Sequence, residues 1–500
     1  MTDTATQREL ARDHDWQRLD PRMLLVHPVK ELLRFLPVLI GIFLARTASG
    51  GAPWHLIGVA VPIGLGVLRY LTTSFRIAGG RVELRRGLLN KHVLSTPLDR
   101  VRTIDLTASP IHRLLGLTTV RIGTGTASTS QDDRLDLDGL PMDRARLLRE
   151  ELLRVTPTDE PTGDAPAGPR VVLGFDPAWI RFAPLTSSGL VIAAGVLGAL
   201  SQLMNTIGGF DHLDPSGWSD SVSGIPVWAA VAGALVTLLV LVSGLAIGGY
   251  VVANWGFTLT NGGGAWHLRR GLLTTRETSL DDDRVAGVSL CEPIGLRIAG
   301  GGQVRAIVTG LDSKQQGSAV LVPPAPFRVC VAVAREVLGV TGPVDAPLVG
   351  HGTTARRRRY TRALLPSGAL LVVVLLVVLL EDLGTWLLVP PLALLVAAGF
   401  VGADRAASLG HALVDRYVVS RSGSLHRRRD ALSVDDVIGW NLRSTWFQRR
   451  AGLTSLVATT AGGTQSVRIL DVPEHDAVAL ADDAVPGLVS QFTVQHSPAS

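Results

Sequence analysis

The sequence contains very little lysine and very little cysteine. Lysine occurs only at positions 30, 91 and 314, so arginine supplies nearly all of the basic charge. The two cysteines, Cys291 and Cys330, have no metal-ligand spacing and are expected to be reduced thiols in a cytosolic domain. The simplest interpretation makes them small buried hydrophobic residues. A disulfide framework and a cysteine-bound zinc site are therefore not predicted.

Sequence motifs of catalysis are also missing. The chain has no His-Glu-x-x-His zinc pattern and no Gly-x-Ser-x-Gly nucleophile elbow. The glycine runs at 262–264 and 300–302 are not followed by the Lys-Ser or Lys-Thr of a phosphate-binding loop, which favours turns. The twelve histidines show no ligand spacing. We therefore predict no enzyme, no catalytic residue, no cofactor and no metal.

The chain does contain long runs without charge. Mean hydropathy is +0.30 and only 18% of residues are charged, which is apolar for a chain of 500 residues. Crossing a bilayer takes a helix of about 20 apolar residues. Six candidate spans in three hairpins meet or approach that length: 32–48, 53–68, 182–210, 226–253, 363–380 and 386–403. The span at 32–48 is the weakest, because Arg34 and Arg46 lie near its ends and must reach the headgroups.

The stretches that follow the hairpins share sequence with one another. Arg85-Arg-Gly-Leu-Leu89 of the first stretch reappears as Arg269-Arg-Gly-Leu-Leu273 in the second. Asp99-Arg-Val101 and Asp283-Arg-Val285 follow at the same distance. Fifteen residues separate Val101 from Gly116, and the same number separate Val437 from Gly452 in the third stretch. Matched spacing predicts one module used three times.

The third copy departs from this pattern. We align its arginines at 427–429 with the paired arginines of the other copies, which puts Arg429-Asp-Ala-Leu432 in place of Arg-Gly-Leu-Leu. In this alignment Asp430 replaces Gly87 and Gly271, two glycines that suggest a turn with positive φ. The stretch from Arg428 to Asp435 is then about six residues short. A trimmed strand hairpin is expected there.

Each module is predicted to be a small antiparallel sheet domain that ends in a helix. Short apolar runs, as at 101–106, 119–122, 285–290 and 304–308, alternate with Gly, Asp and Ser clusters. Amphipathic patterns that open on proline follow at 141–153, 326–338 and 473–485. The predicted fold is a multi-span α-helical membrane protein with three cytoplasmic all-β domains, each with a C-terminal helix.

These features divide the chain into ten predicted segments. They are an N-terminal cytoplasmic tail (1–30), transmembrane hairpin 1 (31–72), module 1 (73–157), a linker (158–180), transmembrane hairpin 2 (181–253), module 2 (254–341), a basic linker (342–361), transmembrane hairpin 3 (362–404), module 3 (405–490) and a tail (491–500).

Arginine predicts the orientation. The loops inside the second and third hairpins carry only acidic charge, whereas arginines flank the module side of all three hairpins. Positive charge marks the cytoplasmic side of a span. The modules and both termini are therefore expected in the cytoplasm, on a multi-pass protein of a bacterial inner membrane.

The Arg-Gly-Leu-Leu strand end, the Leu98-Asp-Arg-Val101 step and the Leu114-Leu-Gly-Leu117 turn, each after two transmembrane helices, resemble bacterial pleckstrin-homology-like membrane proteins of the YdbS/YdbT-like class. The resemblance covers roughly residues 30–490. It implies a pleckstrin-homology-like (PH-like) barrel with a C-terminal helix, no established catalytic residue, and work with membranes or other membrane proteins.

Paired arginines are the recurring charged feature and the candidate contact site for headgroups or an acidic partner. The alternative is an edge-strand charge, or an ion pair with Asp99 or Asp283. Residues 356–359, a basic run before the third hairpin, are explained by topogenic charge. The candidate contact residues are Arg85, Arg86, Arg269, Arg270, Arg427 and Arg428.

The predicted function is a non-enzymatic membrane scaffold. Its expected partners are other membrane proteins, with a shorter one-module relative as one candidate, and anionic lipid headgroups; nucleic acid is not expected. The alternative is a transporter or exporter component for small molecules or peptides, because six spans would suffice. Pro390-Pro391 in the sixth span and Pro62 in the second could break helices for such a role.

Overall fold

The computed structural model forms two compact units, Met1–Asp282 (unit 1) and Asp283–Ser500 (unit 2), each described here by itself. The structure describes residues 16–26, 70–78, 80–86, 92–97, 103–123, 135–154, 169–186, 226–309, 319–460 and 466–487, with a few single residues at 64–68 and 191–205. The boundary between the units lies within residues 254–341, so the strands expected for one module are divided between two units.

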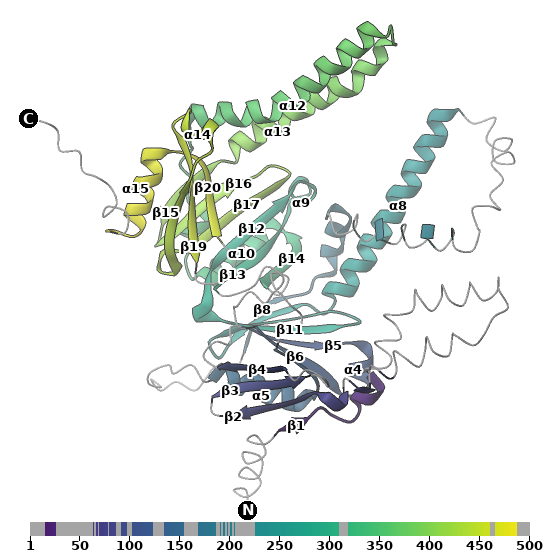
Figure 1. Ribbon diagram of the computed structural model, residues 1–500, viewed down its shortest axis with the longest axis vertical. Coiled ribbons are helices and arrows are strands. Elements are labelled where there is room, and N and C mark those ends of the chain that lie inside the picture. Colours follow the sequence, from purple (N-terminus) through teal and green to yellow (C-terminus); the bar gives the residue numbers. More distant parts are fainter. Residues whose placement is uncertain are drawn as a thin grey trace, which may run out of the picture. The chain divides into compact units, whose positions relative to one another are not determined.

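Unit 1 contains two antiparallel sheets (Figure 1). The four-stranded sheet has the order β1-β2-β3-β4, from β1 (Gln17–Arg18), β2 (Ser74–Ala78), β3 (Arg81–Arg86) and β4 (His92–Pro97). The seven-stranded sheet has the order β7-β6-β5-β11-β10-β9-β8. Its strands are β5 (Thr103–Ala108), β6 (Leu117–Gly123), β7 (Leu135–Pro141), β8 (Arg170–Gly174), β9 (Thr258–Gly262), β10 (Ala265–Arg270) and β11 (Thr275–Asp281).

The helices of unit 1 complete its core and carry one candidate span. They are α4 (Pro110–Leu114), α5 (Met142–Arg154), the 3-10 helix η3 (Pro177–Leu185) and α8 (Val227–Asn254). Alternate residues of β3, β5, β6 and β7 pack with Ala145 and Leu148 of α5 in one apolar core. The helix therefore packs into the core that the two sheets share, and it forms where the sequence pattern at 141–153 predicts a terminal helix.

Unit 2 again contains two antiparallel sheets. The six-stranded sheet has the order β14-β13-β12-β17-β16-β15, and the three-stranded sheet has the order β18-β19-β20. The strands are β12 (Val285–Pro293), β13 (Gly301–Val308), β14 (Val320–Pro326), β15 (Gly410–Val414), β16 (Tyr417–Ser422), β17 (His426–Ser433), β18 (Val437–Arg443), β19 (Leu453–Thr460) and β20 (Ser466–Pro473). An apolar cluster joins the two sheets through Ile307, Leu432 and Val467.

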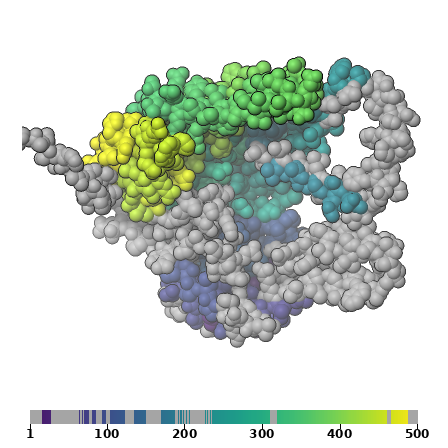
Figure 2. Space-filling view, turned by 45° about the horizontal axis from the view of Figure 1, so that its top comes forward, coloured from purple at the N-terminus to yellow at the C-terminus, as the bar shows by residue number. Residues whose placement is uncertain are grey.

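The helices of unit 2 include two candidate spans. They are α9 (Ile294–Ile298), α10 (Phe327–Leu338), α11 (Gly342–Asp345), α12 (Gly352–Leu380), α13 (Val389–Ala407), α14 (Trp446–Arg449) and α15 (Glu474–Ala484); short 3-10 turns are η4 (Asp282–Arg284), η6 (Thr385–Leu388) and η7 (Val434–Asp436). Helices α10 and α15 form where the sequence predicts terminal helices. Figure 2 shows the green atoms of α12 and α13 next to the yellow C-terminal part of the same unit.

Within the part of the chain that the structure describes, three helices are long and apolar enough to cross a membrane: Leu235–Asn254, Gly352–Leu380 and Thr385–Ala407. They coincide with three of the six predicted spans. The two spans predicted at 32–48 and 53–68 lie outside the described residues, except for residues 64, 67 and 68. The first residues of the span predicted at 182–210 instead belong to η3, where Phe182 is buried, and most of the residues after 186 lie outside the described set.

The tandem prolines do not break a helix. Pro390 and Pro391 stand in the first turn of α13, directly after η6. Proline is tolerated in the first turn, where its missing N–H leaves no helical hydrogen bond unmade. These prolines therefore do not produce the helix break that the transporter alternative predicts for the sixth span. Pro62, in the second predicted span, lies outside the described residues.

One series of elements occurs three times: a strand, a short helix, two strands and a terminal helix. It appears as β5-α4-β6-β7-α5, β12-α9-β13-β14-α10 and β18-α14-β19-β20-α15. After each short helix stands a glycine with φ of +67°, +70° or +62°, namely Gly116, Gly300 and Gly452. The carbonyl of each glycine accepts a hydrogen bond from the first residue of the terminal helix, at 3.1, 2.9 and 3.3 Å. The fifteen-residue spacing in the sequence thus marks a recurrent turn.

The alignment of the third copy given above is wrong. Gly271 (φ +112°) and Gly423 (φ +100°) occupy the same place, after β10 and after β16. A Cβ on either glycine would lie 2.1 Å from the carbonyl oxygen three residues later, of Thr274 or His426. Asp430 lies inside β17, opposite Ser420 and Ser289, and has no positive φ. The hairpin is complete, because the arginines at 427–429 belong to its second strand.

Candidate functional site

Adjacent modules are joined by direct strand pairing, at two places. Strand β5 pairs antiparallel with β11, and β12 pairs antiparallel with β17. We call these the β5–β11 junction, which lies in unit 1, and the β12–β17 junction, which lies in unit 2. Because the first three strands of one module extend the sheet of the previous module, each junction leaves no free edge between them.

Each junction contains a buried hydroxyl–carboxylate hydrogen bond between directly opposite residues. Thr278 Oγ1 donates to Asp105 Oδ1 at 2.5 Å in the β5–β11 junction. Ser289 Oγ donates to Asp430 Oδ1 at 2.5 Å in the β12–β17 junction. All four residues are buried. A one-residue slip would move one partner to the other face of the sheet, so this bond specifies the register.

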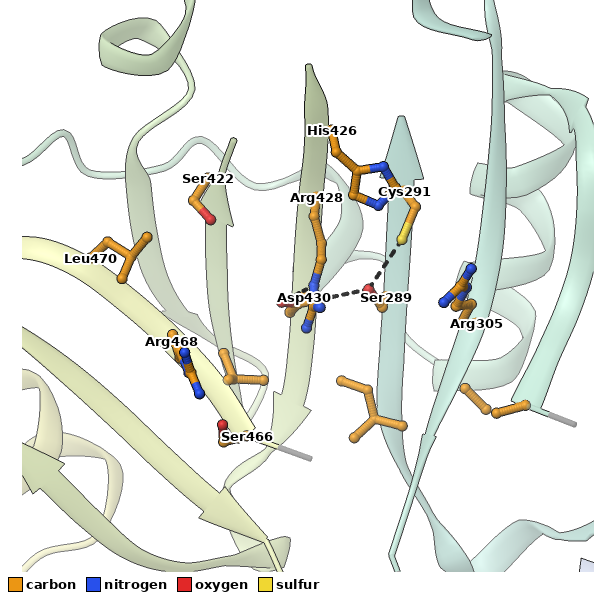
Figure 3. A pocket seen from close by; sticks show the side chains of 14 residues that line it. Ser289, Cys291, Arg305, Ser422, His426, Arg428, Asp430, Ser466, Arg468 and Leu470 are labelled. Carbon is orange, nitrogen blue, oxygen red and sulfur yellow. Dashed lines mark hydrogen bonds and ion pairs between the residues drawn. The ribbon is translucent and has the colours of Figure 1, made fainter. Parts of the chain in front are cut away.

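A cavity of about 360 Å³ lies over the β12–β17 junction (Figure 3). Side chains two residues apart point to the same face of a strand. Thus β12 contributes Ser289 and Cys291, β17 contributes His426, Arg428 and Asp430, and β20 contributes Ser466, Arg468 and Leu470. Arg305, Ala306 and Ile307 of β13, together with Ala319, Ser422 and Val467, complete the lining.

The charge of this cavity is mainly positive. The Nε atom of Arg428 lies 2.7 and 2.8 Å from the two carboxylate oxygens of Asp430, so these two charges balance. Arg305 and Arg468 lie on either side of that pair (Figure 3), and neither forms an ion pair with another described residue. The buried Nε of Arg305 has no hydrogen-bond partner in the described part of the chain. The positive charge of Arg305 and Arg468 is therefore not balanced by a described acidic residue.

The remaining groups do not supply a nucleophile or a strong base. Burial raises the pKa of the Cys291 thiol, so the thiolate form is disfavoured. Burial also lowers the pKa of His426, and the charges of Arg305 and Arg428 lower it further. Burial lowers the pKa of the Arg428 guanidinium, but the charge and the hydrogen bond of Asp430 outweigh it and raise this pKa overall. The positive charge of the cavity is complementary to a small anion, such as a phosphate or carboxylate group.

A second, smaller cavity of about 280 Å³ lies near the β5–β11 junction. It is lined by Arg146 and Arg149 of α5 and by strand residues that include His267, Arg269 and Glu277. The Glu277 carboxylate lies 3.5 Å from Arg149 and 3.4 Å from Arg269, so it already balances part of the positive charge. Of these two junction cavities, the one over the β12–β17 junction is the better candidate for an external anion.

Sequence comparison gives the family of both terminal parts of the chain. Residues 31–156 and residues 362–482 match the model of the bacterial PH domain. These regions belong to the bacterial PH domain family. The first covers β2 to α5, and the second covers most of unit 2 from α12 into α15. Neither the curated proteins nor the solved structures include a significant match to the chain.

The six arginines predicted as contact residues differ in their surroundings. In unit 1, the Arg85 guanidinium lies 5.3 Å from the ring centre of Trp16, and Arg269 lies 3.4 Å from Glu277. Burial lowers the pKa of Arg270, and the nearby Arg276 lowers it further. Arg86 ends β3, and its side chain lies outside the described set.

Of the two in unit 2, only Arg428 reaches the cavity. The Nη2 atom of Arg427 lies 2.8 Å from Asp404 Oδ1, near the end of α13. The role of the six arginines in headgroup or partner contact stays a prediction. Two arginines of the cavity, Arg305 and Arg468, were not among the predicted residues. The sequence offers one signal for this site, the acidic residue Asp430 in the second half of β17.

Half of the basic run at 356–359 has an internal partner. Arg358 Nε lies 3.2 Å from Asp471 Oδ1, and Arg359 Nη2 lies 2.8 Å from Asp471 Oδ2. The Asp471 side chain is buried in β20 and also accepts a hydrogen bond from Gln448 at 2.7 Å. Topogenic charge alone therefore does not explain this run; Arg356 and Arg357 remain exposed.

Proposed function

We propose that this chain is a non-enzymatic integral membrane scaffold that presents three PH-like modules at the cytoplasmic face of a bacterial inner membrane. Its joined modules would bind other membrane proteins, with a shorter one-module relative as one candidate. The cavity over the β12–β17 junction would receive an acidic group of such a partner, or an anionic headgroup.

The observation that carries this proposal is the attachment of the span ends to the sheets of unit 2. Arg358 and Arg359 at the start of α12 pair with the buried Asp471 of β20. At the end of α13, Asp404 pairs with Arg297 of α9 at 2.9 Å and with Arg427 of β17 at 2.8 Å. Ion pairs that are buried, as at Asp471, or partly buried, as at Asp404, fix geometry more than they add stability. A module held in one orientation at the bilayer surface suits a scaffold.

Topology is the first test. Reporters fused after Glu150, Val340 and Ser490 should all give cytoplasmic signals, and a fusion between Asp211 and Asp220 should give an extracytoplasmic signal, because the arginine-rich flanks lie on the module side. Opposite signals from the fusions at Glu150 and Val340 would contradict the proposed arrangement.

Co-purification tests the scaffold itself. The full chain is purified in mild detergent, and the bound membrane proteins are compared with those of an Arg305→Glu, Arg468→Glu variant. Reversing both charges should remove a partner that uses the cavity, and the loss should match the effect of high salt. Arg328→Glu, at an exposed position of α10, is the matched control. An unchanged set of partners in the double variant would contradict the role of the cavity.

A further inference from the structure

The short helices α4, α9 and α14 expose large apolar side chains. The exposed fractions are 87% for Leu114 of α4, 82% for Ile298 of α9, and 57% and 70% for Trp446 and Phe447 of α14. These helices occupy the same place in the series of elements that occurs three times. Single exposed apolar residues are common on proteins, but their presence on all three copies of one short helix needs a shared explanation.

Each short helix is bonded to the module-side end of an apolar helix or to the turn packed on that end. For α4, Arg113 Nη1 donates to the carbonyl of Leu272 at 2.8 Å, and Leu272 N donates to the carbonyl of Val252, in α8, at 2.9 Å. The turn itself adds exposed apolar surface, because Leu273 is also exposed. The exposed apolar surface of α4 and this turn, which we call the apolar tip of unit 1, therefore lies beside the end of α8.

Helix α9 repeats this arrangement in unit 2. Arg297 Nη2 lies 2.9 Å from Asp404 Oδ2 near the end of α13, and Ile294 N donates to the carbonyl of Leu425 at 2.8 Å. Leu425 follows Gly423 as Leu273 follows Gly271, and it is exposed too. Two units thus build the same apolar tip from a short helix, a glycine turn and the end of a span.

Helix α14 has the strongest features of an interfacial segment. Trp446 and Phe447 pack edge to face at 5.0 Å, and the Arg450 guanidinium lies 5.6 Å from the Trp446 ring. Arg443 and Arg449 are exposed nearby. Tryptophan beside arginine is typical of the membrane–water interface, where the ring meets the acyl boundary and the guanidinium meets phosphate.

A rigid base holds these aromatic residues next to α12 (Figure 1). Thr445 and Gln448 form a capping box, and Gln448 also donates to Asp471. Arg358 of α12 lies 3.4 Å from the Thr445 hydroxyl and pairs with the same Asp471. The same group of hydrogen-bonded side chains around Asp471 therefore fixes both α14 and the start of α12.

We infer that α4, α9 and α14 lie in the interfacial layer of the bilayer, with their exposed apolar side chains below the headgroups and the arginines around α14 at lipid phosphate. This inference rests on the proposed membrane function and adds to it a defined lipid-contacting surface. The occupant is a bilayer that contains anionic lipid. Its position follows from the spans, because each tip is bonded beside a helix end that enters the same layer.

Depth-dependent quenching on the full chain tests the inference. Single variants Leu114→Cys, Ile298→Cys and Phe447→Cys are labelled with an environment-sensitive fluorophore and reconstituted into vesicles of phosphatidylethanolamine and phosphatidylglycerol. The natural cysteines are buried, so the unsubstituted chain provides the labelling background. His475→Cys, at an exposed side chain of α15, is the matched aqueous control.

Each probe on a short helix should shift its emission to the blue, lose most of its emission to a nitroxide placed near the lipid headgroup, and resist aqueous iodide. The probe at position 475 should show the opposite behaviour. Iodide quenching of the Phe447→Cys and Ile298→Cys probes equal to that of the control would overturn the inference. Alkaline carbonate extraction separates the two proposals, because release of the chain would contradict the membrane function, whereas retention with aqueous probes would contradict only the interfacial position.

Discussion

The β5–β11 junction of unit 1 and the β12–β17 junction of unit 2 are built alike but place their acid on opposite strands. In unit 1 the aspartate, Asp105, lies on β5, and the hydroxyl group belongs to Thr278 on β11, the strand with which the next module joins the sheet. In unit 2 the hydroxyl is Ser289 and the acid is Asp430. What the two junctions share is the hydrogen bond and its register, not the residue type at either position.

The surroundings of the two bonds also differ. Asp430 additionally accepts hydrogen bonds from the guanidinium of Arg428, inside a cavity that keeps two further arginines. In unit 1, Glu277 lies between two arginines and reduces the positive charge. The same junction therefore serves mainly to join sheets in unit 1, whereas in unit 2 it also forms the floor of the candidate anion site.

Removing the acid should give the largest effect, and a larger one in unit 2. Asp430→Ala leaves a buried hydroxyl and a half-exposed guanidinium without their partner, so the free energy of unfolding should fall by about 3 kcal/mol. Asp105→Ala should cost about 2 kcal/mol. Hydrogen exchange on the full chain in detergent reports each unit separately. Asp435→Ala, which removes an exposed ion pair with Arg416, is the control and should change little. Equal losses in both units would break the comparison.

The glycine turns should respond equally in the two units. Gly271→Val and Gly423→Val each force a β-branched side chain into positive φ and into contact with a carbonyl, so each should lower the stability of its own unit by about 3 kcal/mol. Gly350→Ala, where nothing lies within 4 Å of the added Cβ, is the control. Local hydrogen exchange near each turn is the readout; no change at Gly423→Val would contradict the steric constraint assigned to this turn.

Acid pH should distinguish unit 2. His411 Nδ1 lies 3.0 Å from His351 Nε2, and burial, together with the neighbouring His411, lowers the pKa of His351 from 6.5 to about 4. The folded state then binds fewer protons than the unfolded state, so stability is complete above pH 6.5 and falls as the pH drops from 6.5 toward 4. The loss in unit 2 should approach about 3 kcal/mol at pH 4. His351→Gln should flatten this dependence, and a steeper loss in unit 1 would contradict it.

Exchanging the two partners should give the smallest effect. Asp105→Ser combined with Thr278→Asp moves the acid of unit 1 to the strand that carries it in unit 2. If stability depends only on the hydrogen bond and not on which strand carries the acid, the free energy of unfolding of the double variant should be about 1 kcal/mol higher than that of Asp105→Ser alone. The comparison uses the midpoint of thermal unfolding in detergent. Strict additivity of the two changes would show that the direction of the bond matters.

The sequence predicts the elements of each module better than it predicts their pairing. Terminal helices appear at α5, α10 and α15 because their apolar spacing is local, and three spans are evident from composition. The edge strands of the copies have similar sequence patterns. The local pattern therefore cannot decide whether β11 pairs with a strand of its own module or with a strand of the previous module. The arginine run at 427–429 misled the alignment, because a charge pattern was matched where the turn glycine, Gly423, carries the constraint.

The candidate site was only partly accessible from sequence for the same reason. Arg428 belongs to a recognisable run, but Arg305 and Arg468 join it from strands far away in the chain. The partner of Arg358 and Arg359 is likewise Asp471, more than a hundred residues later. Long-range ion pairs of this kind follow from tertiary packing and leave no local periodicity.

Disulfide cross-linking across the β5–β11 junction tests most directly the central claim that neighbouring modules share one sheet. Asp105 and Thr278 are directly opposite on adjacent strands, whereas Ser279 is opposite Ile104 and its side chain points to the other face. The chain carries Asp105→Cys with Thr278→Cys, or with Ser279→Cys as control, and a protease site is inserted in the linker at 158–168. After mild oxidation and cleavage, the two fragments of the Asp105→Cys, Thr278→Cys chain should remain linked until reduced, and those of the control should separate. Linkage in the control alone, or in neither chain, would contradict the shared sheet.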